Sequence, residues 1–181
     1  MVTALSLNLE VASHVSSGKA QEHVRQAHTL AKLLLTDVRE AVSQLREDGR
    51  IELGAAMRAL CEGVPALEIA LDMPEDFALE DPECAHVLLR CAQEIITNTV
   101  RHAEARTLSL RVQRSGSAVV LHARDDGRGA EHVTSGNGLR GMRERLAAVG
   151  GTMALSSARG RGFALEVHLP LEPAHDSRMP G

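Results

Sequence analysis

Aromatic residues are almost absent from this chain of 181 residues, which contains two Phe, no Trp and no Tyr. Its core must therefore be built from Leu, Val, Ile, Ala and Met. Proteins that bind single-stranded nucleic acid stack successive bases on aromatic side chains. The formal net charge of −4 gives no overall bias towards a polyanion either. We therefore expect no nucleic-acid partner.

The sequence also lacks the features of disulfide-rich and membrane-spanning proteins. Its three cysteines, Cys61, Cys84 and Cys91, are odd in number and have no metal-type spacing, which favours reduced thiols in the cytoplasm. No signal peptide is evident, and no apolar run approaches the roughly 20 residues of a membrane span. We expect a cytoplasmic chain without membrane contact of its own. This expectation is compatible with a longer parent protein that is anchored in the cell membrane.

Residues 1–48 have the pattern of two helices. Apolar residues recur at alternating spacings of four and three, for example at Ala27, Ala31, Leu34 and Val38, and "SSGK" interrupts an earlier run. Such a stripe is typical of a helical bundle. Because two antiparallel helices cannot bury it alone, the pattern predicts a homodimer that closes a four-helix bundle. The alternative is a hairpin packed on the rest of its own chain.

Beyond residue 48, helices alternate with paired strands. The segment "DPECAHVLLRCAQEIITNTVRHAEA" predicts one long helix, which Asp81 caps and Pro82 begins. Two alternating runs around Ser115-Gly116-Ser117 predict a hairpin, followed by a helix and a second hairpin. The order predicts an α+β fold over 49–171, a two-layer α/β sandwich with a mixed sheet and helices on one face. Residues 172–181 are expected to form a flexible tail.

The long helix carries a row of polar side chains. Glu94, Asn98 and either Arg101 or His102 are three or four residues apart, so they share one face. An amide oxygen suits Mg²⁺, which takes only one or two protein ligands, and a carboxylate one turn away can orient a water or polarise a hydroxyl. Taken alone, however, such a row is more often a solvated helix surface.

A glycine-rich stretch follows the first hairpin. Asp125 ends the second strand, where its carboxylate can accept a hydrogen bond from an exocyclic amine. Gly127 and Gly129 allow positive φ or a close approach of the backbone to a ring. Gly136 and Gly138 lead into a helix whose free N–H groups favour an anion.

Another glycine pair, Gly160 and Gly162, lies in the last hairpin. The glycines do not follow a first strand as G-x-G-x-x-G, and the chain contains neither GKS nor GKT, so the Rossmann and P-loop interpretations fail.

Together these motifs resemble the ATP-binding domain of histidine kinases (HATPase, Bergerat fold). "QEIITNTVRHAEA" is similar to the N box of that family, "DDGRG" to the first glycine box and "GNGLRGMRERLAAVGG" to the second. "TALSLNLEVAS" and "LLLTDVREAVSQLR" resemble the latter part of the dimerisation and phosphotransfer hairpin of NarL-type sensor kinases. The resemblance covers about residues 3–170.

The resemblance implies the catalytic portion of a two-component sensor histidine kinase, which transfers the γ-phosphoryl group of ATP to a histidine for relay to a response-regulator aspartate. It implies Glu94 as the catalytic carboxylate, Asn98 as the Mg²⁺ ligand and Asp125 as the partner of the adenine amino group. The residues implied to bind ATP are Asn98, Arg101, His102, Asp125, Gly127, Gly129, Gly136, Gly138, Leu139, Gly160 and Gly162. The implied partners are a NarL-type response regulator and a second copy of the chain.

Three features depart from the family pattern. Asp126 stands where Asn is frequent and Phe163 where Thr is usual, which predicts weaker nucleotide binding. The family's "LHD"-type phosphoacceptor histidine precedes "LTALSL", whereas this chain begins "MVTALSL". We therefore expect a fragment of a sensor kinase that does not phosphorylate itself.

Two other functional classes stay open. One is an ATP-binding pseudokinase or dimerisation module, against which the intact Glu94 argues. The other is an anti-sigma-type serine kinase, against which the long hairpin argues. A helical scaffold without nucleotide is disfavoured by the order of the three motifs.

Overall fold

The computed structural model describes residues 17, 18, 20, 24, 53–62, 64, 67–133 and 136–171. Apart from four single positions, the predicted hairpin over residues 1–48 lies outside the described residues. The predicted tail over residues 172–181 lies outside them as well. The homodimer expected from the hairpin therefore stays a prediction.

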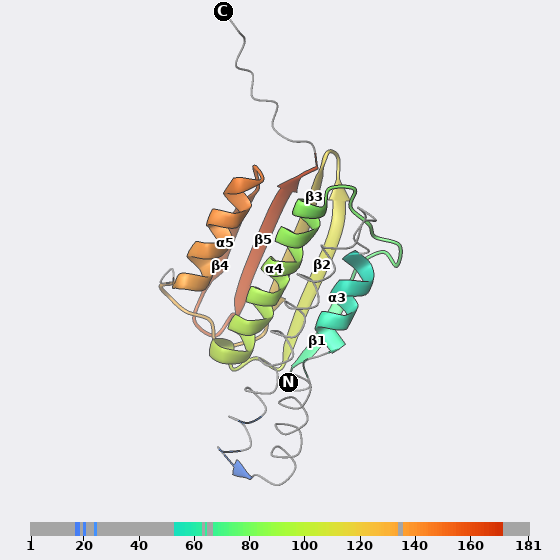
Figure 1. Cartoon of the computed structure of the whole chain (residues 1–181). Coiled ribbons are helices and arrows are strands. Elements are labelled where there is room, and N and C mark those ends of the chain that lie inside the picture. The colour runs from blue at the N-terminus through green and yellow to red at the C-terminus, as the bar shows by residue number, and fades with distance from the viewer. Residues whose placement is uncertain are drawn as a thin grey trace, which may run out of the picture.

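One layer of the described part is a five-stranded sheet with the strand order β1-β2-β3-β5-β4 (Figure 1). The strands are β1 (Glu68–Asp72), β2 (Thr107–Ser115), β3 (Ala118–Asp125), β4 (Thr152–Ser157) and β5 (Phe163–Pro170). Strand β1 runs parallel to β2, and the other three pairs are antiparallel. The sheet is thus mixed, as predicted.

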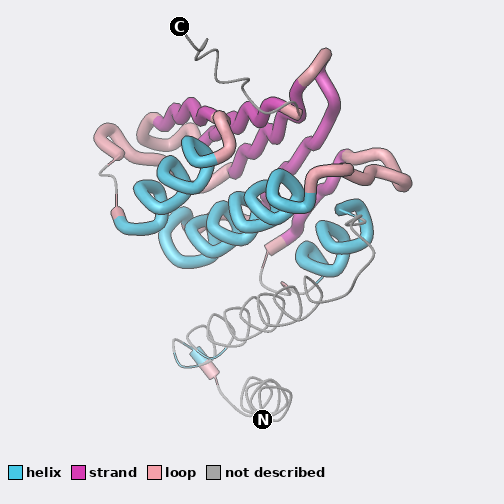
Figure 2. The backbone as a smooth tube through the Cα atoms, turned by 45° about the horizontal axis from the view of Figure 1, so that its top comes forward, coloured by secondary structure: helices cyan, strands magenta, loops and turns pink. Residues whose placement is uncertain are grey.

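The other layer consists of helices that cover one face of the sheet (Figures 1 and 2). They are α3 (Leu53–Glu62), α4 (Pro82–Asn98) and α5 (Asn137–Ala148), and α4 packs between the other two. The opposite face of the sheet carries no helix of the described part. This arrangement confirms the two-layer α+β sandwich.

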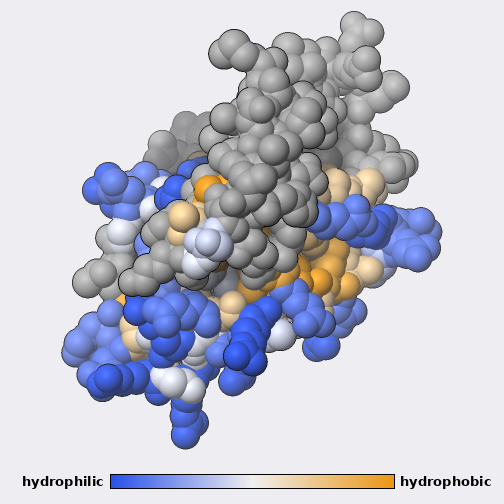
Figure 3. Space-filling model, turned by 90° about the horizontal axis from the view of Figure 1, so that it is seen from below, coloured by the Kyte–Doolittle hydropathy of each residue, from blue (hydrophilic) through white to orange (hydrophobic). Residues whose placement is uncertain are grey.

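The alternation of side chains along the strands places the core between the two layers. In β2, Leu108, Leu110 and Val112 are buried, whereas the residues between them are exposed. Leu88 and Ile96 of α4 are fully buried against this face. Seen from below, hydrophilic residues surround much of the visible rim, and apolar residues gather nearer the middle (Figure 3).

Asp81 and Pro82 begin α4 as predicted. The Asp81 Oδ1 atom accepts hydrogen bonds from the backbone N–H groups of Glu83 at 2.8 Å and Cys84 at 3.4 Å. Although partial desolvation opposes it, hydrogen bonding from Cys84 and Glu83 lowers the pKa of the Asp81 carboxyl. The start of α4, the helix that carries Glu94 and Asn98, is therefore set by the Asp81 cap.

Replacing Asp81 by Ala should lower the free energy of unfolding by about 1 kcal/mol at pH 7, because α4 loses its N-cap. Since the pKa of Asp81 is lowered in the folded state, the stabilisation is present above the ordinary value of 3.8 and is lost as the pH falls below it. Urea denaturation at pH 7 and pH 3 measures both effects. Asp81→Asn, which keeps a capping oxygen, is the control and should stay near the unmodified chain at pH 7.

Candidate active site

A cavity of about 790 Å³ lies where the C-terminal end of α4 meets the N-terminal end of α5. Both helix ends lie at the lower edge of the sheet and helix layers in Figure 1. Strands β3, β4 and β5 and the loop after β3 supply the remaining wall. The lining residues are Ile95, Asn98, Thr99, His102, Ala103, Asp125, Arg128, Gly129, Ala130, Glu131, His132, Val133, Gly136, Gly138, Leu139, Met142, Ser157, Arg159, Phe163 and Leu165.

Near the C-terminal end of α4, a carboxylate and an amide lie one helical turn apart, and the amide residue, Asn98, lines the cavity. Asn98 Nδ2 donates a hydrogen bond of 2.8 Å to Glu94 Oε1, and both residues are half-buried. The predicted shared face is therefore present. Because the Asn98 amide nitrogen is engaged, its oxygen is the atom left to act as a ligand.

A π-helical turn, Thr99–Ala103, follows Asn98 and ends at Glu104 in the left-handed conformation with φ 54°. The predicted helix thus reaches this far, but its last turn is wider than an α-helix. Such turns occur frequently at functional sites. His102 lines the cavity, whereas Arg101 is exposed and is not part of the lining.

Asp125 ends β3 and is only 4% exposed. Its Oδ1 atom accepts hydrogen bonds from the backbone N–H of Gly127 at 2.9 Å and of Phe163 at 3.2 Å. Neither bond uses Oδ2, so this oxygen is available as an acceptor at the cavity wall. A buried, oriented acceptor of this kind suits a ligand amine.

The glycines around Asp125 allow backbone segments to touch. A Cβ on Gly127 would overlap the carbonyl oxygen of Ala103, and one on Gly129 would overlap that of Ala158. A Cβ on Gly162 would overlap the carbonyl oxygen of Asp125 itself. Gly129 lines the cavity, whereas Gly127 and Gly162 lie behind Asp125 and are not part of the lining.

Gly160 also lies outside the lining, with open space around its Cβ position and φ +74°. It supports the turn between β4 and β5. The cavity lining therefore includes most of the predicted residues but leaves out Glu94, Arg101, Gly127, Gly160 and Gly162. Glu94 is hydrogen-bonded to Asn98, which does line the cavity.

The N-terminus of α5 closes the opposite side of the cavity. The N-cap residue is Gly136, which has no side chain that could bond the first N–H groups of the helix. Gly136, Gly138 and Leu139 all line the cavity. The first backbone N–H groups of a helix have no partner within it and attract negative charge.

Arg128 was not predicted, yet it connects three parts of the site. Its Nε donates to the carbonyl oxygen of His102 at 3.0 Å, and its Nη1 donates to Glu104 Oε1 at 3.0 Å. Its backbone carbonyl accepts from Gly160 N–H at 2.6 Å. In the sequence, only its position between two glycines singled out Arg128. That position does not reveal hydrogen-bond partners more than 20 residues away.

The two substitutions noted in the sequence have different surroundings. Asp126 is absent from the lining, and its Oδ1 accepts from the backbone N–H of Thr107 at 2.9 Å and of Arg106 at 2.8 Å, which lowers its pKa. The structure thus places Asp126, expected to add negative charge near the nucleotide, outside the lining, where its carboxylate binds the start of β2. Phe163 does line the cavity.

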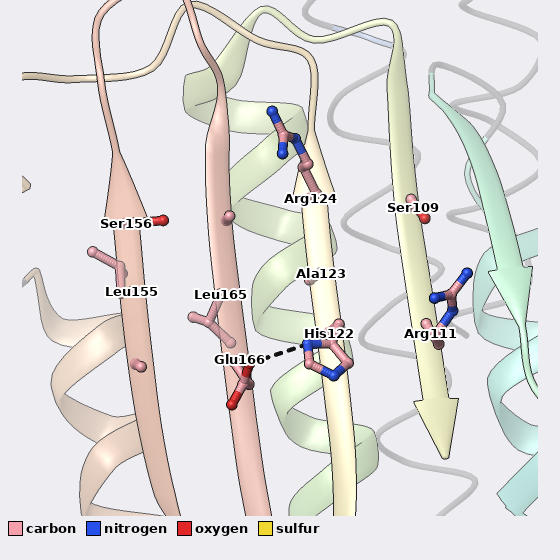
Figure 4. A pocket seen from close by; sticks show the side chains of 11 residues that line it. Ser109, Arg111, His122, Ala123, Arg124, Leu155, Ser156, Leu165 and Glu166 are labelled. Atoms are coloured by element: carbon pink, nitrogen blue, oxygen red, sulfur yellow. Dashed lines mark ion pairs between the residues drawn. The ribbon is translucent and has the colours of Figure 1, made fainter.

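A second hollow, of about 460 Å³, lies on the uncovered face of the sheet (Figure 4). Small residues such as Ser109 and Ser156 border it, and His122 Nδ1 lies 3.3 Å from Glu166 Oε2. It contains none of the predicted site residues. The chemical groups singled out in the sequence therefore converge only on the helix side, as far as the described residues show.

The donor set fits a magnesium ion that is shared with a phosphate ligand. Asn98 supplies an amide oxygen, and Mg²⁺ commonly takes only one or two protein ligands when phosphates supply others. Within the described residues, no group of three His, Cys, Asp or Glu side chains is placed to hold a metal. A metal cage made only of such side chains is therefore not present in that part of the chain.

The sequence of this domain matches a known protein family. Residues 85–173 match the family described as histidine kinase-, DNA gyrase B- and HSP90-like ATPase. This part of the chain is accordingly similar to the ATPase domains of that family. No helix of the described part is long and apolar enough to cross a membrane.

The relatives are sensor histidine kinases. The chain is 30% identical over 158 residues to the sensor histidine kinase LnrJ of Bacillus subtilis (strain 168), covering 86% of this chain and 40% of LnrJ. It is 27% identical over 154 residues to DesK of the same organism, covering 82% and 41%. The chain thus spans about 40% of the length of these relatives.

A solved structure shows the same fold. The histidine kinase domain of the blue-light activated kinase from Erythrobacter litoralis EL346 superposes with a TM-score of 0.61 at 19% identity. The superposition covers 93% of this chain and 96% of that domain.

Proposed function

We propose that this chain is the ATP-binding catalytic portion of a two-component sensor kinase, which transfers the γ-phosphoryl group of ATP to a histidine. The observation that carries the proposal is the convergence of three features on one cavity: the Glu94–Asn98 pair, the Asp125 carboxylate and the N-terminus of α5. Each suits a different part of Mg-ATP.

Asp125 is proposed to bind the adenine amino group through Oδ2, because its Oδ1 is already engaged by backbone donors. The glycines beside it bring backbone rather than side chains to the base. The free N–H groups at the start of α5 are proposed to bind the phosphates. Phosphoryl transfer is catalysed mainly by such positioning and charge stabilisation.

Asn98 is proposed to hold Mg²⁺ through its amide oxygen, and the bound ion would neutralise charge on the phosphates. Glu94, held by Asn98, is proposed to assist the attacking imidazole as a hydrogen-bond or proton acceptor. His102, at the cavity wall, is proposed to lie near the phosphates. Four of the residues implied to bind ATP would support the site from outside the cavity lining, namely Arg101, Gly127, Gly160 and Gly162.

The acceptor is proposed to be a histidine of a dimerisation hairpin, followed by relay to a response regulator of the NarL type. The homodimer, the cytoplasmic location and a membrane-anchored parent belong to the same proposal. Its support is the similarity to sensor kinases that are more than twice as long as the matched segment.

Replacing Glu94 by Gln tests the proposed reaction. The substitution keeps the shape but removes the charge and most of the basicity, so transfer of labelled γ-phosphate to a supplied histidine-bearing hairpin should fall by about a hundredfold or more. Affinity for Mg-ADP should change little. Equal transfer by both proteins would exclude Glu94 as the assisting carboxylate, and nucleotide binding without any transfer would favour the pseudokinase alternative.

A further inference from the structure

The backbone of Gly138 lies directly against the Glu94 carboxylate. Gly138 is the second residue of α5, and a Cβ on it would overlap Glu94 Oε1 and lie 2.6 Å from Cδ. That same oxygen accepts the 2.8 Å hydrogen bond from Asn98 Nδ2. The space that a side chain at position 138 would fill is therefore the space that the carboxylate occupies.

This contact differs in kind from those of the other site glycines. At Gly127, Gly129 and Gly162 the nearest obstructing atom is a backbone carbonyl oxygen, which cannot move without a change of the fold. At Gly138 they belong to the end of a flexible side chain. Gly138 is also helical without a positive φ, so Ala at this position satisfies the backbone and even has the higher helix propensity.

We propose that Gly138 is a positioning residue for phosphoryl transfer. Because Gly138 has no side chain, the Glu94 carboxylate has room to stay hydrogen-bonded to Asn98. The inference rests on the proposed roles of Glu94 and Asn98. Gly138 also lines the cavity at the N-terminus of α5. The same turn of helix therefore sets the position of both the phosphate-facing N–H groups and the assisting carboxylate.

The test compares Gly138→Ala with Gly141→Ala, an equal change three residues along the same helix. At position 141 a Cβ would lie 3.2 Å from Arg145 Nη1 and would not approach Glu94. Both variants should unfold at a temperature no lower than the unmodified chain. Transfer to a supplied histidine-bearing hairpin should fall about tenfold or more in Gly138→Ala only, with the Kd for Mg-ADP within about threefold.

A readout that needs no nucleotide is the side-chain amide resonance of Asn98, identified by its loss in Asn98→Asp. Gly138→Ala should move this resonance towards its position in Glu94→Ala, whereas Gly141→Ala should leave it in place. A shifted resonance in a chain that does not bind Mg-ADP would show that Gly138 positions Glu94 but would refute the proposed function and, with it, a role in phosphoryl transfer. An unmoved resonance, or a loss of transfer matched by an equal loss of affinity, would overturn the positioning role.

Discussion

Replacing Asp125 by Asn is expected to lower the affinity for Mg-ADP by roughly ten- to hundredfold while the domain stays folded. Asn keeps an oxygen for the backbone donors of Gly127 and Phe163, which now bond Oδ1. Its amide nitrogen replaces Oδ2 and donates instead of accepting. An adenine amino group would then face a second donor, a mismatch that costs about 1–3 kcal/mol in a buried site.

The matched control is Asp126→Asn, the same chemical change one residue along the chain. Asp126 is exposed and is bonded to the backbone at the start of β2, outside the cavity lining. Its substitution should leave the affinity within about threefold. Calorimetric titration of the three proteins with Mg-ADP provides the comparison, and thermal unfolding checks that each is folded. If Asp125→Asn bound as tightly as the unmodified chain, the adenine would not lie at Asp125.

The second large effect concerns stability: Gly129→Ala should lower the free energy of unfolding by roughly 2–5 kcal/mol. Gly129 has φ +61°, where an L side chain costs about 1–2 kcal/mol. Its Cβ would overlap the Ala158 carbonyl oxygen and lie 2.8 Å from that of Gly162. Overpacking against backbone adds about 1–3 kcal/mol. This loss is large against a typical total of about 5–15 kcal/mol.

Gly160→Ala separates the two contributions. Gly160 has a similar φ of +74°, but nothing lies within 4 Å of its Cβ position. Only the conformational cost of about 1–2 kcal/mol should therefore remain. Urea denaturation of both variants measures the difference. Equal losses would mean that the loop after β3 is not held against the β4–β5 turn.

The sequence predicted the layers of this fold because the layers follow from local patterns. Leu108, Leu110 and Val112 alternate with exposed residues, and this period of two is visible without a structure. Asp81 and Pro82 are similarly local signals for a helix start. The shared face of Glu94 and Asn98 follows from helical spacing alone.

Contacts between distant segments could not be predicted in this way. The bonds of Arg128 to His102 and Glu104, and of Asp126 to the start of β2, join residues about 20 or more positions apart. The π-helical turn after Asn98 was also missed, because an apolar spacing of three and four fits a regular helix equally well. Whether Gly138 had room for a side chain depended on the placement of α5 beside α4.

The measurement that tests the central claim most directly is a titration of the isotope-labelled chain with Mg-ADP, followed by backbone amide resonances. The cavity beside α4 and α5 predicts saturable shifts at Gly129, Gly138 and Leu139, and none at Ser109 or Ala164 on the uncovered face of the sheet. Saturable shifts confined to the uncovered face, or no saturable shifts at all, would contradict the assignment of this cavity as the nucleotide site.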